Sequence, residues 1–172
     1  MTILKKKLVS YSIWLMPYGS KFDELQELIN FCSSFLNSPL FQPHVTLCGG
    51  FQGDYNDILI KAERISREIK PFLINFNQIN SSNQFFYSIF IDVILDHKLN
   101  VARKICVQHF SDKKKIYKPH LSLAYGIFNR DKIAIIKRKN INIKNFFVNK
   151  IIISKNDEVN LKWKVLDEIY LL

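Results

Sequence analysis

Two short stretches of the chain share one pattern and are identical at three of five positions: Pro43–Leu47 reads PHVTL, and Pro119–Leu123 reads PHLSL. Both follow the order proline, histidine, apolar residue, hydroxyl residue, leucine. Their histidines, His44 and His120, stand 76 positions apart (120 minus 44) in a chain of 172 residues. This spacing is close to half the chain, and it predicts two similar halves that each supply one copy.

Each stretch is predicted to form a short strand, because a proline precedes it and a glycine follows it closely. Side chains two positions apart on a strand lie on the same face. His44 should therefore share a face with Thr46, and His120 with Ser122, while the apolar residues between them face a core. If the two strands lie near one another, two imidazoles and two hydroxyls meet in one pocket.

These groups suit the cleavage of a phosphodiester. One imidazole takes a proton from water and the other protonates the leaving oxygen, since the ordinary pKa of histidine is ~6.5. The hydroxyls can donate hydrogen bonds to phosphate oxygens. A single His-x-Thr stretch is more often structural, but a matched pair favours catalysis. His97 and His109 lack this context and are interpreted as surface or helix residues.

The rest of the chain predicts interleaved helices and strands. The polar turn Asn80–Asn83 between two strand-like runs indicates an antiparallel hairpin, so the predicted fold class is α+β. Ser20 is the expected N-cap of the first helix. No linker divides residues 1–172, which are predicted to form one domain of two closely packed lobes. Strands are expected at Leu8–Met16, His44–Cys48, Phe72–Ile79, Phe85–Leu95, His120–Ala124, Phe146–Ser154 and Leu161–Leu171, and helices at Ser20–Phe35, Asp54–Ile69, Lys98–Phe110 and Arg130–Lys139.

The net charge of +10 indicates an anionic ligand, including nucleotide phosphates or nucleic acid. Solvated loop and helix faces would explain the same lysines, so the charge does not identify the ligand. The basic clusters are Lys5–Lys7, Lys113–Lys115 with Lys118, and Lys137–Lys139.

No apolar run approaches the ~20 residues that a membrane-spanning helix requires, and the N-terminus lacks the pattern of a signal peptide. The three cysteines, Cys32, Cys48 and Cys106, have no paired spacing and are predicted to be free thiols. We therefore expect a cytoplasmic protein with no membrane partner. We also expect a monomer, although no sequence pattern fixes the oligomeric state.

The two motifs resemble those of the 2H phosphoesterase superfamily. Within it, the chain resembles the cyclic phosphodiesterases of the plant and yeast type, also in the flanking stretches Ser12–Pro17, Pro39–Gly50 and Pro119–Gly126. The resemblance implies a bilobal fold with two pseudo-symmetric lobes, each with an antiparallel sheet, around a central cleft. It also implies a metal-independent enzyme without a cofactor.

The resemblance further implies a role for each residue. His44 would be the general base, His120 the general acid, and Thr46 and Ser122 would hold the phosphate, although the acid and base labels could be exchanged. Tyr125 matches a tyrosine that lines the site in this family. Strict alternation would turn it away from His120 unless the strand ends or bends at the next residue. The implied substrates are ADP-ribose 1″,2″-cyclic phosphate and nucleoside 2′,3′-cyclic phosphates, opened to phosphomonoesters.

Other interpretations remain open. An RNA 2′,3′-cyclic phosphodiesterase or RNA-end-processing enzyme would use the same residues on a polymer, and a non-catalytic RNA- or nucleotide-binding module is the alternative from another class. A zinc site would use Cys48, which is expected to share the face of His44 and Thr46, with His120 completing a three-ligand set. Aromatic residues that could stack on a base are Trp14, Phe51, Phe85, Phe86 and Tyr87.

Overall fold

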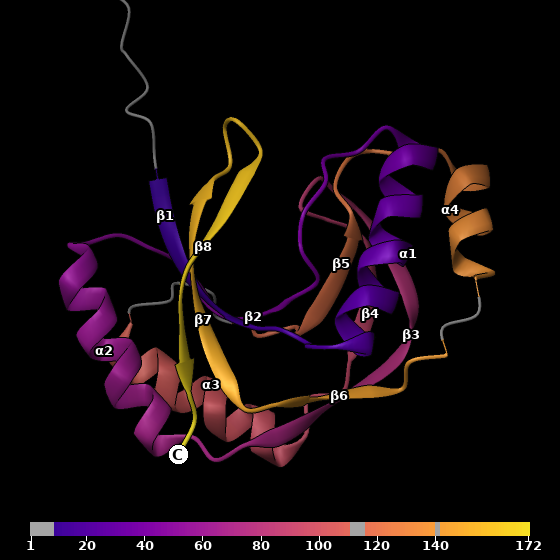
Figure 1. Ribbon diagram of the computed structural model, residues 1–172. Coiled ribbons are helices and arrows are strands. Elements are labelled where there is room, and N and C mark those ends of the chain that lie inside the picture. The colour runs from indigo at the N-terminus through magenta and orange to yellow at the C-terminus, as the bar shows by residue number, and fades with distance from the viewer. Residues whose placement is uncertain (1–8, 111–115, 140–141) are drawn as a thin grey trace, which may run out of the picture.

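The computed structural model describes residues 9–110, 116–139 and 142–172, and its central feature is an antiparallel sheet of eight strands (Figure 1). The strands lie in the order β6-β3-β4-β5-β2-β1-β7-β8. The α+β class that the sequence predicts is confirmed. The strands are β1 (Val9–Leu15), β2 (Val45–Phe51), β3 (Phe72–Gln84), β4 (Tyr87–Val93), β5 (His120–Ala124), β6 (Asn145–Val148), β7 (Lys150–Asp157) and β8 (Lys162–Tyr170).

The sheet has two halves of four strands that meet at β2 and β5, the strands carrying the repeated motif. The helices are α1 (Ser20–Leu36), α2 (Tyr55–Glu68), α3 (His97–His109) and α4 (Arg130–Lys137). The helix α1 precedes β2 in the chain but contacts β5 of the other half, and α3 precedes β5 but contacts β2. Each half of the sheet is therefore covered by a helix from the segment that leads into the other half. As Figure 1 shows, α2 and α3 lie on one side of this junction and α1 and α4 on the other.

The helices begin where the sequence offers a side-chain cap. Asp54 accepts a hydrogen bond from the backbone N–H of Asn56 at the start of α2, and Asn129 caps α4 in the same way. The helix α1 is the exception, because its N-cap is Gly19 and no side chain caps it. The prediction that Ser20 is the N-cap was therefore wrong. Gly19 has a φ of 57°, a conformation that costs glycine little.

Two predicted strand boundaries were wrong. The polar stretch Asn80–Asn83 belongs to β3, and the turn falls on Phe85–Phe86 instead. The polar side chains find partners within the hairpin: Asn80 donates to the Asp92 carboxylate at 3.1 Å, and the Ser82 hydroxyl donates to a β4 backbone carbonyl. The predicted strand Phe146–Ser154 is two strands, β6 and β7, that end and begin on either side of Asn149.

The core is built from the inward faces of both halves together with residues of α1, α2, α3 and α4. All three cysteines are buried and free of disulfides, as predicted. The clusters Lys5–Lys7 and Lys113–Lys115 lie outside the described residues. Within the described part of the chain, every helix is too short or too polar to cross a membrane.

Candidate active site

The two motif strands lie side by side and antiparallel, with Val45 of β2 opposite Leu121 of β5. This register places His44 beside Ser122 and Thr46 beside His120. The Cβ atoms of directly opposite residues on one face of a sheet are about 4.5–5.5 Å apart. Since Val45 and Leu121 are fully buried in the core, the four polar side chains gather on the other face.

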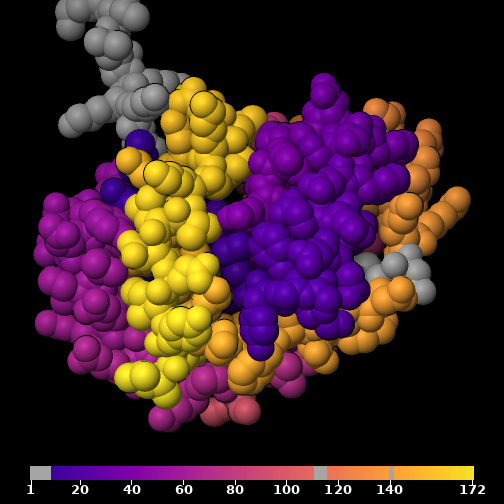
Figure 2. Space-filling view, in the orientation of Figure 1, coloured from indigo at the N-terminus to yellow at the C-terminus, as the bar shows by residue number. Residues whose placement is uncertain are grey.

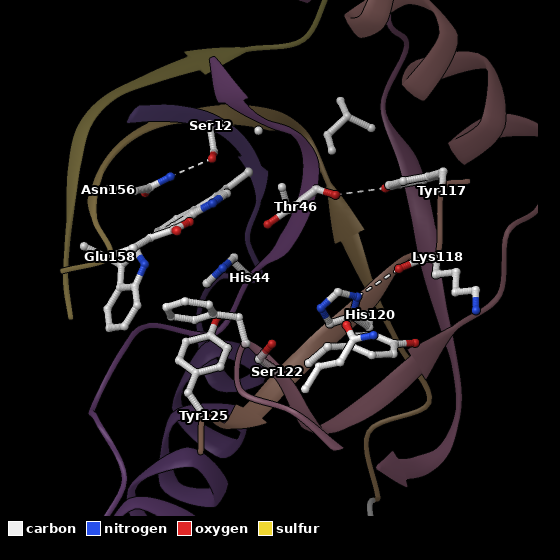
Figure 3. Close-up of a pocket in the computed structure, with 18 of the residues that line it drawn as sticks. Ser12, His44, Thr46, Tyr117, Lys118, His120, Ser122, Tyr125, Asn156 and Glu158 are labelled. Carbon is white, nitrogen blue, oxygen red and sulfur yellow. Dashed lines mark hydrogen bonds between the residues drawn. The ribbon is translucent and has the colours of Figure 1, made fainter. Parts of the chain in front are cut away.

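These four side chains line a cavity of about 560 Å³ (Figure 3). Cavities of this size hold ligands as large as a nucleotide. The structure thus brings the four motif residues together with Tyr125, the fifth residue that the sequence analysis singles out. The cavity wall also includes Ser12, Trp14, Arg103, Tyr117, Lys118, Asn156, Glu158 and Trp163.

Both histidines are held by a backbone carbonyl two residues earlier in the chain. Nδ1 of His44 lies 2.7 Å from the Gln42 oxygen, and Nδ1 of His120 lies 2.8 Å from the Lys118 oxygen. A carbonyl can only accept, so Nδ1 carries the proton in each ring. Nε2 is therefore the atom that can gain or lose a proton during a reaction.

The surroundings of His44 disfavour its charged form. The ring is 6% exposed and stacks on Trp14, with 3.7 Å between ring centroids and 14° between planes. Burial lowers the pKa of His44 to about 4, the Gln42 carbonyl opposes this shift, and the nearby charge of His120 adds to it. His44 is consequently neutral at pH 7 in the empty site.

His120 is held in a more open place on the opposite side of the cavity. Its ring is only partly buried and meets the edges of Tyr87 and Phe90, at centroid distances of 4.5 and 5.5 Å. The two imidazoles thus share an anchoring geometry but differ in their exposure to water. That difference suits opposite roles in proton transfer.

A bulge in β2 separates Cys48 from this face. Thr46 pairs with Trp14 and Cys48 pairs with Ile13, so Leu47 is an extra residue on β2. An extra residue reverses the alternation of faces. Cys48 is fully buried in the core, and the expectation that it shares the face of His44 was wrong. Among the described residues, no group of three or more His, Cys, Asp or Glu side chains could hold a metal ion.

Two residues that the sequence analysis missed hold the backbone at this bulge. The Tyr117 hydroxyl donates to the Thr46 carbonyl at 3.0 Å, and the Arg103 guanidinium donates to the Leu47 carbonyl at 2.7 Å. The guanidinium also lies over the Tyr117 ring, 4.7 Å from its centroid. The sequence did contain a signal for Arg103, because this charged residue stands in the apolar stripe of α3. In the structure its side chain is buried, with 6% exposed.

Tyr125 reaches the cavity because β5 ends at Ala124, immediately before it. Gly126 follows with a φ of 145°, a conformation that side-chain-bearing residues rarely adopt. The Tyr125 ring stacks on Phe41 at 4.3 Å. Burial raises the pKa of Tyr125 to about 12, the Ser122 hydroxyl opposes this shift, and the Glu158 charge adds to it.

The aromatic candidates divide between the cavity and the core. Trp14, Phe85, Phe86 and Tyr87 line the cavity, whereas Phe51 stacks on Phe110 in the core at 4.1 Å. The sequence analysis missed Trp163, which stands on the β8 strand and also lines the cavity.

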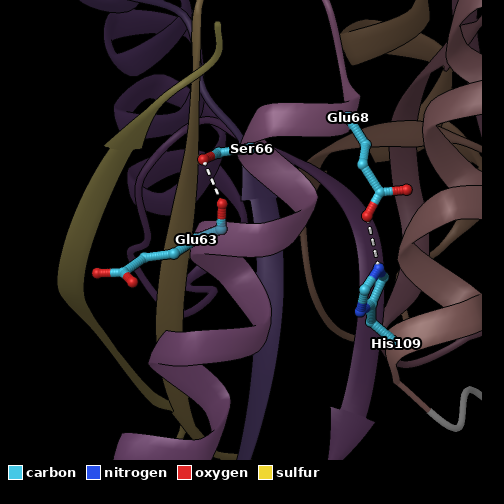
Figure 4. Close-up of polar contacts among 4 residues, drawn as sticks. All are labelled: Glu63, Ser66, Glu68 and His109. Atoms are coloured by element: carbon cyan, nitrogen blue, oxygen red, sulfur yellow. Dashed lines mark hydrogen bonds and ion pairs between the residues drawn. The ribbon is translucent and has the colours of Figure 1, made fainter.

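The remaining histidines lie away from this site, as the sequence indicates. His109 at the end of α3 forms an ion pair with Glu68 of α2 at 2.9 Å (Figure 4). In the same view, Ser66 donates to the Glu63 carbonyl within α2. His97 is exposed at the first position of α3.

Comparison with known proteins agrees with this architecture. The chain is 28% identical over 145 residues to a 2′,3′-cyclic-nucleotide 3′-phosphodiesterase of Kluyveromyces lactis, covering 72% of this chain and 68% of that protein. Its fold matches that of LigT from E. coli in the apo form, with a TM-score of 0.63, 10% identity, and coverage of 96% and 99% of the two chains. The Thermus thermophilus protein TT0787 matches with a TM-score of 0.58 and 14% identity, over 94% and 97% of the chains.

The family described as cyclic phosphodiesterase-like protein matches residues 9–166, nearly the whole chain. This match includes both motif strands and every residue of the cavity wall named above. The chain therefore belongs to the cyclic phosphodiesterase-like family, a group of phosphodiesterases with the fold of the 2H phosphoesterases.

Proposed function

We propose that this protein hydrolyses cyclic phosphate diesters, with His44 and His120 as the acid–base pair and no metal ion in the step. The observation that carries the proposal is the pairing of Val45 with Leu121, which sets one imidazole and one hydroxyl from each half beside one another. Because both halves contribute to the cavity, we also propose that residues 1–172 act as one domain.

In the proposed step, Nε2 of His44 takes a proton from a water molecule while the water oxygen bonds to phosphorus. The bond from phosphorus to one of the two ribose oxygens of the cyclic phosphate breaks, and Nε2 of His120 gives that oxygen a proton. One water is consumed and one phosphomonoester is formed. The base role for His44 is supported by its low pKa of about 4, which keeps Nε2 unprotonated.

The hydroxyls of Thr46 and Ser122 are proposed to donate hydrogen bonds to the phosphate oxygens that gain charge in the transition state. Tyr125, which lines the same cavity, is proposed to contact the substrate. The pKa of Tyr125, about 12, means that its hydroxyl stays protonated at pH 7 and can itself act as a donor.

The proposed substrates are nucleoside 2′,3′-cyclic phosphates and ADP-ribose 1″,2″-cyclic phosphate, opened to a nucleoside 2′-phosphate or ADP-ribose 1″-phosphate. The name of the Kluyveromyces lactis relative supports the first class. Structures of E. coli LigT with 3′-AMP and with NADP+ share the fold and support a ligand of nucleotide size.

A cyclic-phosphate-ended RNA is a second candidate, favoured by the rim of the cavity. Phe85 and Phe86 form the β3–β4 turn, are 40% and 39% exposed, and lie edge to face 4.9 Å apart. Exposed aromatic rings stack on unpaired bases. The exposed Lys118, which also lines the cavity, can contact a backbone phosphate.

The test is hydrolysis of ADP-ribose 1″,2″-cyclic phosphate, nucleoside 2′,3′-cyclic phosphates and a short cyclic-phosphate-ended RNA, all measured in EDTA. We expect turnover to survive chelation, because imidazoles and hydroxyls supply the whole step. Activity that disappears in EDTA and returns with zinc would overturn the proposed mechanism. A KM that rises steeply with salt only for the RNA would identify the polymer as the substrate, since phosphate contacts release counterions.

The pH dependence of kcat/KM should be bell-shaped, with its acid limb below the ordinary histidine pKa. The base must be unprotonated, so activity falls as pH drops through the pKa of His44, which burial lowers from 6.5 to about 4. The acid must be protonated, so activity also falls as pH rises. Both apparent values belong to the coupled pair.

Trp14→Leu provides the matched comparison, because it removes the ring that shields His44 from water. The acid limb of this variant should move up toward 6.5. A wild-type acid limb already at 6.5 or above, unmoved by Trp14→Leu, would contradict the role given to burial.

A further inference from the structure

The two ends of the cavity carry opposite charge. Lys118 and the buried Arg103 line the end near His120, whereas Glu158 lines the opposite end, beyond His44. Figure 3 shows Lys118 and Glu158 on opposite sides of the histidine pair. A phosphate is attracted to the first end and repelled from the second. A substrate that holds its cyclic phosphate between the histidines therefore has a preferred direction.

The anionic end is built by β1 and the β7–β8 hairpin. The amide of Asn156 donates to the Ser12 hydroxyl at 2.6 Å and accepts from the Ser154 hydroxyl at 3.0 Å, and all three residues are buried. A Cβ on Gly49 would stand 2.6 Å from the Ser12 hydroxyl, so β2 can pass here only as glycine. These contacts join β1, β2 and β7 at this wall of the cavity.

The same end offers an aromatic surface. The half-buried Trp163 lies 5.3 Å from the Tyr125 ring and meets Phe41 edge to face at 5.8 Å. In the space-filling view, the tip of the hairpin lies against the segment that follows α1 (Figure 2). Ring faces of this kind stack on nucleobases, and stacking alone does not distinguish one base from another.

Glu158 can distinguish guanine from the other bases, which stacking alone cannot do. Its carboxylate has two oxygens that only accept hydrogen bonds. Guanine presents two neighbouring donors, N1–H and N2–H, on one edge. Adenine and cytosine pair a single amino group with an acceptor nitrogen, and uracil sets one N–H between two carbonyls. Only guanine therefore meets a carboxylate with two donors side by side.

We propose that the hairpin end of the cavity is a nucleobase subsite that prefers guanine, with Trp163 as the stacking surface and Glu158 as the acceptor. For the nucleoside 2′,3′-cyclic phosphates, the subsite reads the base on the ribose that carries the cyclic phosphate, and any further phosphate of the substrate points toward Lys118. This inference rests on the proposed function, because it places the cyclic phosphate at the histidine pair.

The experiment compares kcat/KM for the 2′,3′-cyclic phosphates of guanosine, adenosine, cytidine and uridine, in the wild type and in Glu158→Gln. We expect the wild type to prefer the guanosine substrate by about tenfold or more, the range of a paired hydrogen-bond contact. Glu158→Gln should reduce that ratio to about one, because glutamine replaces one acceptor by a donor. Glu168→Gln is the control: this glutamate lies on the same hairpin, paired with Lys150, outside the cavity wall.

Equal rates on all four bases in the wild type, or an equal loss on all four in Glu158→Gln, would overturn the subsite. If no cyclic phosphate is hydrolysed, the proposed function fails, and calorimetric binding of guanosine 2′-phosphate against adenosine 2′-phosphate still decides the subsite. Tighter binding of the guanosine compound that Glu158→Gln abolishes would support it, and equal binding would refute it.

Discussion

Replacing either motif histidine by asparagine should lower kcat by about 10²–10⁴-fold, the usual size of a general acid–base contribution. Asparagine is the sharpest choice because its amide nitrogen can take the place of Nδ1. The hydrogen bonds to the Gln42 and Lys118 carbonyls, 2.7 and 2.8 Å long, can then be kept while Nε2 is removed. Loss of turnover would thus report on proton transfer rather than on the position of the strand.

The His44→Asn and His120→Asn double variant should be hardly slower than the slower single variant, since groups that act as a unit are not additive. His97→Asn is the control, because His97 is exposed on α3 and outside the cavity wall. Steady-state kinetics in EDTA compares the two single variants, the double variant and the control with the wild type, and circular dichroism verifies that each variant is folded. A single variant that folds and keeps more than a tenth of wild-type kcat would refute the two-histidine mechanism.

Removing one phosphate-binding hydroxyl should cost about 10²-fold in kcat, the size found for a single donor to a developing oxyanion. Thr46→Val keeps the branched shape and removes only the oxygen, and Ser122→Ala does the equivalent on β5. The loss should appear in kcat more than in KM, because the hydrogen bonds strengthen as charge gathers on the phosphate.

Thr46→Ser is the matched variant, because it returns the hydroxyl without the methyl group and should recover most of the lost rate. A Thr46→Val enzyme with unchanged kcat would show that the hydroxyl does not contact the phosphate.

The pattern of apolar residues was enough to predict most of the helices and strands. The helix α2 runs from Tyr55 to Glu68 with Asp54 as its cap, within the range predicted from its apolar stripe. The hairpin turn was misplaced because Asn80–Asn83 looks like a turn, while two phenylalanines look like a strand. The phenylalanines can occupy a turn because they border the cavity, where their rings contact each other and the Phe86 ring contacts Tyr125.

The bulge at Leu47 could not be predicted from the alternation of side chains along the strand. Alternation predicts that Cys48 faces the ligand with His44, whereas the unpaired residue between Thr46 and Cys48 turns it into the core. Whether a strand accommodates an extra residue depends on its neighbour, here β1, which stands more than thirty positions earlier in the chain. The same holds for Arg103 and Tyr117, whose contacts with β2 span 56 and 71 positions.

The sequence by itself determined the two-fold repeat, the α+β class, and the four motif residues that the structure gathers at one cavity, whereas Tyr125 was placed there by the family resemblance. Those are local properties, since a repeated motif and the spacing of apolar side chains can be read within a few residues. Only the tertiary structure decided that Val45 stands opposite Leu121, that burial against Trp14 makes His44 a neutral imidazole, and that Glu158 lines one end of the cavity. Register, burial and electric field arise between distant segments, and they exist only once the chain has folded.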